Sequence, residues 1–211
     1  FPLSQITALP ALLNQYPQLI GLNVTIPYKE QVLAYLDEID EQAQAVGAVN
    51  TVRIRDGRLK GYNTDVYGFE HSLRAMIDQS KYPTPRAALV LGTGGAAKAV
   101  LFVLAQMGIE VTSVSRTATK GDLTYDQLTA SHIQAHQLIV NTTPLGMSPH
   151  QDTFPILPYS DIGEEHFLYE LVYNPEKTVF LIKGEKQGAA ILNGLPMLHL
   201  QAERAWSIWQ V

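Results

Sequence analysis

The chain has 211 residues, 46% of them hydrophobic and 17% charged, a composition that excludes a disordered or fibrous protein and provides for one large core or two modest ones. Its formal net charge of −5 lacks the basic footprint of a nucleic-acid-binding protein, and no apolar run approaches the roughly 18 residues of a membrane span. The absence of cysteine excludes disulfides and thiolate metal sites and fits a reducing compartment. We therefore expect a cytoplasmic globular protein that binds neither nucleic acid nor a membrane.

The first part of the chain predicts a small α/β unit. We expect a short helix over 9–16 and a strand over 19–26. Pro27 suits the first position of a further helix, whose apolar face would consist of Val32, Leu33, Leu36 and Ile39. Another helical stretch over 40–46 is expected to end at Gly47.

A hairpin and a longer helix follow. Asp56-Gly57 is a strong two-residue turn signal, so the flanking segments 48–55 and 58–62 are predicted to be paired strands. Asn63-Thr64-Asp65 then supplies the residue types that cap helices. The helix that follows would bury a stripe formed by Val66, Phe69, Leu73 and Met76.

Tyr82-Pro-Thr-Pro85 predicts a stiff linker, which we take as a domain boundary. Beyond it, strands alternate with helices, and this pattern indicates a parallel, doubly wound sheet. The expected strands are 87–91, 109–115, 137–141 and 167–173, and the expected helices are 95–107, 125–128, 178–186 and 195–209.

The strand over 87–91 leads into the spacing Gly92, Gly94, Ala97, the G-x-G-x-x-A form of the dinucleotide-binding fingerprint. The glycines permit a tight turn and a close approach of the backbone to a pyrophosphate, which the N–H groups at the helix start would hold. Glycine-rich turns also occur for steric reasons alone. Because a strand precedes these glycines and a helix follows them, the sequence favours a nucleotide site.

The end of the next strand indicates which nucleotide is bound. NAD sites usually carry an acidic residue there, roughly 20 residues after the glycines, to bind the ribose hydroxyls. Here the segment 115–120 reads Ser-Arg-Thr-Ala-Thr-Lys and contains no acid. Arg116 and Lys120 are positioned to pair with a 2′-phosphate, although an exposed basic turn is an alternative interpretation for Lys120.

Three polar residues of the first part have both a structural and a functional interpretation. Lys29 is expected in a first helical turn, where the helix dipole disfavours a cation, yet a single lysine is most often solvated. Asn50 lies in a predicted strand otherwise suited to burial. Asp65 at a helix start is explained by capping alone.

Seven segments, taken together, resemble the shikimate dehydrogenase family in order and spacing: GLNVTIPYK, GAVNT, GYNTD, GTGGAA, NTTPLGM, YNPEKT and NG-x-x-ML-x-x-Q. They cover nearly the whole chain. The resemblance implies a Rossmann-type nucleotide domain, a smaller α/β substrate domain and a cleft between them. We expect residues 1–82 and 193–211 to form the substrate-binding domain and residues 86–190 the NADP-binding domain.

By this resemblance, Lys29 and Asp65 are the paired catalytic residues. Oxidation of a secondary alcohol by hydride loss needs a group that takes the hydroxyl proton, and the reverse reaction needs the same group as an acid. Lysine is normally protonated at neutral pH, and an ion pair with Asp65 favours that form. Asp65 therefore orients the lysine and the substrate hydroxyl more plausibly than it activates the lysine, but either residue remains a candidate for moving the proton.

The resemblance also implies the binding residues. Those expected to bind the substrate are Thr25, Asn50, Asp65, Tyr173 and Gln201. Those expected to bind NADP are Gly92, Thr93, Gly94, Gly95, Ala96, Ser115, Arg116, Thr117, Lys120, Thr142 and Gly194. The family's adenosine-side turn is typically Asn-Arg-Thr followed by another arginine, so Ser115 and Lys120 depart from it. Glu170 stands where related sequences usually have aspartate.

The implied reaction is the reversible, NADPH-dependent reduction of 3-dehydroshikimate to shikimate. Two alternatives are a quinate/shikimate dehydrogenase that uses NAD and a non-catalytic NADP-binding sensor. An acid at 115 or 116 would favour the first, and loss of Lys29 or Asp65 would favour the second.

The six histidines lack ligand spacing, so no metal is expected. The oligomeric state is expected to be a monomer or a homodimer.

The start of the chain carries a further expectation. Phe1 is not a methionine, and the first residues resemble a point inside the family's substrate domain. The family's Ser-x-Ser-Pro turn, which holds the substrate carboxylate, has no counterpart in residues 1–20, where Ser4 stands alone. We therefore expect a substrate domain that lacks its N-terminal part, with NADP binding retained and shikimate bound poorly.

Overall fold

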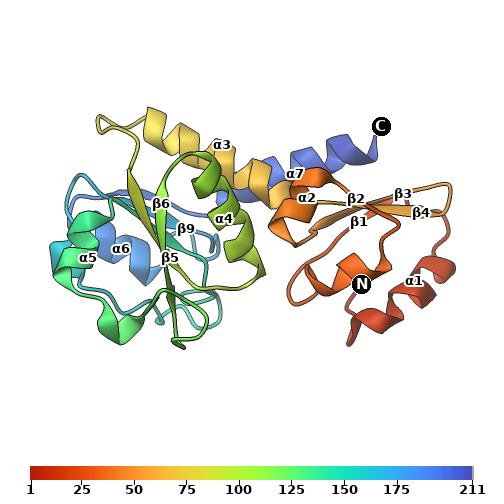
Figure 1. The fold of residues 1–211 in the computed structure, drawn as a ribbon, viewed down its shortest axis with the longest axis horizontal. Helices are drawn as coiled ribbons and strands as arrows, with labels where there is room; N and C mark the ends of the chain where they lie inside the picture. The colour runs from red at the N-terminus through yellow and green to blue at the C-terminus, as the bar shows by residue number, and fades with distance from the viewer. Residues whose placement is uncertain (211) are drawn as a thin grey trace.

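The computed structural model describes residues 1–210, which build two β-sheets at opposite ends of an elongated molecule (Figure 1). The smaller sheet has the order β1-β3-β4-β2. Its strands are β1 (Gly21–Asn23), β2 (Glu38–Ile39), β3 (Thr51–Arg55) and β4 (Arg58–Tyr62). β3 and β4 form the predicted hairpin, in which Asp56 and Gly57 both take positive φ angles, as a type I′ turn requires.

Short helices cover the smaller sheet: η1 (Ile6–Ala8), α1 (Leu9–Gln15), η2 (Gln31–Tyr35) and α2 (Glu41–Val46). The expectation of a helix from Pro27 through Ile39 is wrong. A 3₁₀ turn, η2, is followed by the extended β2, which pairs in parallel with β4. The apolar residues that suggested a helical face instead pack into one core from two elements, Val32 from η2 and Ile39 from β2.

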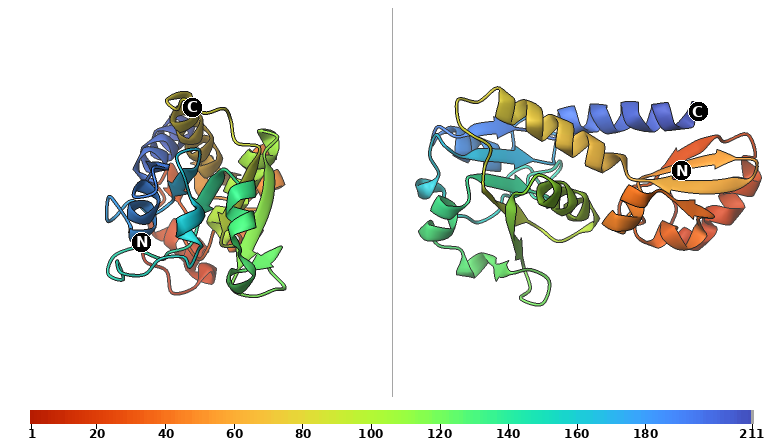
Figure 2. Two further views of the ribbon diagram at one scale, coloured as in Figure 1. Left: turned by 90° about the vertical axis from the view of Figure 1, so that its left-hand side faces the viewer. Right: turned by 45° about the horizontal axis from the view of Figure 1, so that its top comes forward.

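Two long helices, α3 (Thr64–Asp78) and α7 (Leu195–Trp209), run side by side and connect the two sheets (Figure 2). Asn63 caps α3, as predicted, by accepting from Val66 N. The helices approach closely at Gly68, where a Cβ atom would lie 2.6 Å from the carbonyl oxygen of Met197. Within residues 1–210 no helix combines the length and the apolar character needed to cross a membrane.

The larger sheet has six strands in the order β10-β9-β8-β5-β6-β7, all paired in parallel. They are β5 (Ala87–Leu91), β6 (Glu110–Ser115), β7 (Leu123–Thr124), β8 (Leu138–Asn141), β9 (Phe167–Glu170) and β10 (Ala190–Leu192). The associated helices are α4 (Gly95–Gln106), η3 (Tyr125–Gln127), α5 (Ala130–Ala135), η4 (Tyr159–Asp161) and α6 (Val179–Glu185). The expected α/β class with a doubly wound, Rossmann-type sheet is confirmed.

Both faces of this sheet are buried, which explains its uninterrupted apolar strands. Along β5, Ala88 and Val90 pack with α3 and α4, whereas Leu89 and Leu91 pack with α5 and α6. The helix α3 shares the first of these cores: the Phe69 ring packs edge-on against Tyr169, and Ser72 Oγ lies 2.6 Å from the Tyr169 hydroxyl. The two ends of the molecule are therefore joined by a common hydrophobic core.

Candidate active site

Lys29 and Asp65 form a close ion pair between the two ends of the molecule. Lys29 Nζ lies 2.6 Å from Asp65 Oδ2, and the two side chains are only 16% and 9% exposed. Asp65 is in the first turn of α3, where the helix dipole stabilises a carboxylate. Lys29 lies in a loop ahead of η2 and not in a helical turn, so the expected conflict with a helix dipole does not arise.

Asn50 holds the other oxygen of the same carboxylate. Its Nδ2 donates to Asp65 Oδ1 at 2.9 Å and to Thr64 Oγ1 at 3.0 Å, and its Oδ1 accepts from the Thr64 N–H at 2.7 Å. Asn50 itself is only 3% exposed, just ahead of β3. The backbone carbonyl of Lys29 accepts from the Val49 N–H, which fixes the lysine loop to the same segment. Asp65 is thus held on both oxygens.

Gln201 reaches this cluster from α7. Its Oε1 lies 3.4 Å from Thr64 Oγ1 and 3.5 Å from Asn50 Nδ2. The sequence predicts Thr64 only as a capping residue, yet Thr64 is buried and contacts both Asn50 and Gln201. Its place in the GYNTD motif, beside Asp65, was the available signal.

Two expected substrate residues lie outside this cluster of hydrogen bonds. Thr25 is exposed, and its hydroxyl is 3.5 Å from the Ile26 carbonyl oxygen. Tyr173 is 48% exposed on the loop after β9. In the part of the chain that the structure describes, neither side chain hydrogen-bonds to Lys29, Asn50 or Asp65. Both are free to contact a ligand from solvent.

The glycine turn after β5 leaves the start of α4 accessible. Gly92 has φ +105°, and a Cβ there would lie 2.7 Å from Thr142 Oγ1, which donates to the Leu91 carbonyl oxygen. Gly94 is the N-cap of α4, no side chain caps that helix, and its first turn carries no acid. Open space surrounds the Gly94 Cβ position. The first N–H groups of α4 are therefore available for an anion.

The end of β6 fits the adenosine side of the same ligand. Ser115 is buried and its hydroxyl accepts from the Thr117 N–H, while Arg116, Thr117 and Lys120 are exposed. At the other edge of the sheet, just after β10, a Cβ at Gly194 would overlap the Leu171 carbonyl, so only glycine fits there. An uncapped helix start and exposed cations without an acid suit a dinucleotide with a 2′-phosphate.

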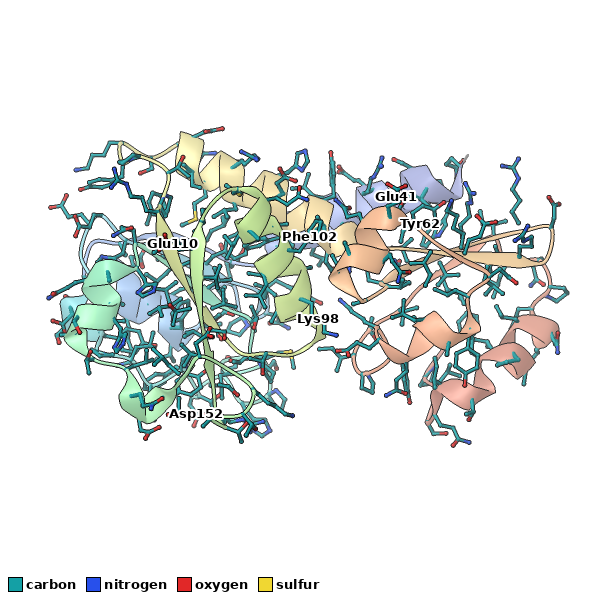
Figure 3. The ribbon with its side chains drawn as sticks, viewed as in Figure 1. Glu41, Tyr62, Lys98, Phe102, Glu110 and Asp152 are labelled. Carbon is teal, nitrogen blue, oxygen red and sulfur yellow. The ribbon has the colours of Figure 1, made fainter. Side chains whose placement is uncertain are left out.

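The cluster of Lys29 and Asp65 lies next to the glycine turn at the start of α4. A Cβ at Gly95, the first residue of α4, would lie 3.9 Å from Lys29 Cβ. One turn along the helix, Lys98 Nζ lies 2.8 Å from Glu30 Oε2, and Figure 3 shows Lys98 on the side of α4 that faces the smaller sheet. The ion pair of Lys29 and Asp65 is therefore next to the nucleotide turn.

The chain is similar to known proteins over most of its length. A shikimate dehydrogenase (NADP(+)) of Methanococcus maripaludis is 38% identical over 206 residues, which are 91% of this chain and 72% of that protein. This chain belongs to the shikimate dehydrogenase family. The family model for the shikimate dehydrogenase substrate binding domain matches residues 4–52, the segment that carries Thr25, Lys29 and Asn50.

Solved structures match the chain over both ends of the molecule. Shikimate 5-dehydrogenase from Thermus thermophilus, in complex with NADP(H) and shikimate, is 36% identical with a TM-score of 0.84, and the match covers 98% of this chain and 79% of that one. Quinate dehydrogenase from Corynebacterium glutamicum, in complex with NAD, is 28% identical with a TM-score of 0.85, and the match covers 97% and 77%. The same fold therefore occurs in structures solved with NADP(H) and with NAD.

Proposed function

We propose that this chain catalyses the reversible, NADP-dependent reduction of 3-dehydroshikimate to shikimate. The observation that carries the proposal is the 2.6 Å ion pair of Lys29 and Asp65 beside the uncapped start of α4. Hydride transfer between a dinucleotide and a hydroxy acid requires a residue pair for proton transfer next to a site that binds the anionic dinucleotide. Relatives at 36–38% identity that carry the shikimate dehydrogenase (NADP(+)) name support the same function.

Lys29 is assigned the proton transfer. Asp65 has both oxygens engaged, Oδ2 by Lys29 and Oδ1 by Asn50, and this geometry suits a residue that orients its neighbours. In the reducing direction the Lys29 ammonium would give a proton to the carbonyl oxygen of the substrate, and in the oxidising direction the neutral Lys29 amine would take the hydroxyl proton. Asp65 and Asn50 would orient the ammonium and the substrate hydroxyls, and we add Thr25, Tyr173 and Gln201 as substrate contacts.

The second ligand would be held by backbone and by cations. NADP supplies or accepts the hydride when it is bound. The N–H groups of Gly94, Gly95 and Ala96 would bind its pyrophosphate, and Arg116 with Lys120 its 2′-phosphate. The other residues assigned to the cofactor are Gly92, Thr93, Ser115, Thr117, Thr142 and Gly194.

Activity measurements test the proposal. Shikimate and quinate are each offered as the alcohol, with NADP and with NAD, and formation of the reduced nicotinamide is followed by absorbance. We expect shikimate with NADP to give the highest kcat/KM. Preference for quinate with NAD would overturn the assignment of substrate and cofactor. NADP binding without turnover of either alcohol would identify a sensor and not an enzyme.

Variants test the catalytic pair. Lys29→Ala is expected to lower kcat by about two to four orders of magnitude, the usual range for general acid–base catalysis, with little change in the KM for shikimate. Asp65→Asn should impair both constants because Asp65 contacts Lys29 and Asn50. Lys60→Ala, which removes an ion pair with Glu38 outside the site, is the control. A near-normal kcat in the Lys29 variant would show that this lysine is not the proton donor.

We also propose a division into two domains and a state of association. We assign residues 1–82 with 193–211 to substrate binding and 86–190 to NADP binding. The net charge of −5 argues against nucleic acid as a partner. A cytoplasmic monomer or homodimer is the form we propose, and sedimentation of the active protein would distinguish the two states.

A further inference from the structure

Glu170 is a buried carboxylate at the end of β9 that the proposed reaction does not use. The residue has 0% exposure. Its Oε1 accepts from Asn141 Nδ2 and from the Val172 N–H, both at 3.1 Å. Its Oε2 accepts from Asn141 Nδ2 and from Thr178 Oγ1, both at 3.0 Å. Buried carboxylates are costly unless they are fully hydrogen-bonded, and this one has donors on both oxygens.

The donors belong to two loops. Asn141 ends β8, and its Oδ1 in turn accepts from the N–H and the hydroxyl of Thr143. Thr178 is the N-cap of α6, where its hydroxyl accepts from the Leu181 N–H. Glu170 is therefore the centre of a hydrogen-bonded network that fixes the start of the loop 142–148 and both ends of the loop 171–178.

Both loops carry residues assigned to ligands. Thr142 begins the first loop and packs against Gly92 of the glycine turn. Tyr173 projects from the second loop and is 48% exposed. The loops also meet directly, since the Ser148 N–H donates to the Asn174 carbonyl and a Cβ at Gly146 would lie 3.0 Å from Thr178 Cβ. A displacement at Glu170 would thus move the cofactor side and the substrate side together.

We propose that Glu170 is a positioning residue for the reaction, which places Thr142 against the cofactor and Tyr173 against the substrate through Asn141 and Thr178. The inference rests on the proposed function. Only the ionised carboxylate, the form present above the pKa of about 7 of Glu170, offers acceptors on both oxygens. A glutamine would turn an N–H₂ group toward Asn141, Val172 or Thr178. An aspartate is one methylene shorter and cannot reach all of these donors without a shift of the loops.

The test compares Glu170→Gln and Glu170→Asp with Tyr169→Phe as a matched control. Tyr169 is the neighbour of Glu170 on β9, and its variant also loses a buried hydrogen bond, but to Ser72 of α3 and not to the network of Asn141 and Thr178. Thermal unfolding, NADP binding by calorimetry and the kinetic constants are measured for each protein. Thr178→Val, which removes one donor and keeps the carboxylate, replaces Glu170→Gln if that variant does not fold.

We expect Glu170→Gln to raise the Kd of NADP and the KM of shikimate and to lower kcat/KM by about 10- to 100-fold, the size of effect that a small displacement of bound groups produces. Glu170→Asp should recover part of the loss. Tyr169→Phe should lower the thermal midpoint and leave these constants unchanged.

The outcomes separate the two proposals. Wild-type constants in a folded Glu170→Gln protein would refute the positioning role and leave the proposed function intact. Equal losses in Tyr169→Phe would show a general effect of destabilisation and would also refute it. If the wild-type protein binds NADP but does not oxidise shikimate, the proposed function fails, and the Kd of NADP alone still decides for or against Glu170.

Discussion

Arg116 stands at the end of β6, exposed and without an acidic neighbour in the segment 115–120. A guanidinium binds a phosphate through two parallel hydrogen bonds and is always charged. We expect Arg116→Ala to raise the KM for NADP by about 10- to 100-fold, which corresponds to the roughly 1.5–3 kcal/mol of a hydrogen bond to a charged group, and to change the KM for NAD little.

Initial-rate measurements with each cofactor check this prediction. Lys120→Ala is the comparison, and its effect should be smaller because an ammonium is a single point charge without the fork geometry. Equal losses with NADP and NAD in the Arg116 variant would contradict a role at the 2′-phosphate.

Glu170 also gives the stability of the protein a pH dependence. Burial raises the pKa of this carboxyl to about 7, against the opposing effect of hydrogen bonds from Asn141, Val172 and Thr178. Because the folded state holds the proton more tightly than the unfolded state, the contribution of Glu170 to the free energy of unfolding decreases as the pH rises from about 4.5 to about 7, by about 3 kcal/mol.

Chemical denaturation across this pH range checks the sign. Glu170→Gln cannot titrate, so the free energy of unfolding of the wild-type protein minus that of the variant should decrease as the pH rises and then stay constant above about pH 7. A difference that is independent of pH, or one that increases, would show that the pKa of this carboxyl is not raised in the folded protein.

Among the helices, the contact between α3 and α7 decides where Gln201 lies. A Cβ at Gly68 would come 2.6 Å from the Met197 carbonyl oxygen and 3.2 Å from Gln201 Cβ. Gly68→Ala would normally stabilise a helix by roughly 0.5–1 kcal/mol, but a backbone atom cannot yield as a side chain can. We therefore expect a net loss of about 1–3 kcal/mol and a raised KM for shikimate, since α7 must move away from Asn50.

Urea denaturation and the KM for shikimate are the measurements. Arg74→Ala, an exposed change on the same helix, is the control and should stay within about 0.5 kcal/mol of the wild-type protein. A stabilised Gly68→Ala protein with an unchanged KM would show that the two helices adapt without displacement of Gln201.

At the level of the whole molecule, the ion pair of Lys98 and Glu30 joins the part that contains the larger sheet to the part that contains the smaller sheet. Lys98 lies on helix α4, and Glu30 lies in the loop of Lys29. Both side chains are partly exposed, so their attraction is worth about 0.2–1 kcal/mol and is screened by salt. We expect Lys98→Glu to lower kcat/KM by up to several-fold at low ionic strength, because repulsion from Glu30 would move α4 away from the loop of Lys29.

The reversed pair, Lys98→Glu with Glu30→Lys, should recover most of the activity, and high salt should reduce the differences. A double-mutant cycle on kcat/KM measures the coupling. Strictly additive effects of the two single changes would mean that this ion pair does not help to hold the two ends together.

The sequence by itself determined the parts that depend on short-range pattern. The strand, glycine turn and helix from Ala87 to Gln106 follow from local sterics, since only glycine adopts the φ of +105° at Gly92 with ease. The Asp56-Gly57 hairpin is equally local. Several short motifs in a fixed order together indicate the family, and no single motif would be enough.

Tertiary structure decided what depends on contacts between distant residues. The spacing of Val32, Leu36 and Ile39 fits a helix, but a 3₁₀ turn and a strand paired with β4 bury the same side chains and satisfy the backbone through that pairing. The sequence places Asn50, Asp65 and Gln201 on separate elements, and only the packing of α7 against α3 and β3 brings them together. Glu170 likewise gained its role from donors 29 residues before it and 8 residues after it, because a buried charge requires partners that local sequence does not reveal.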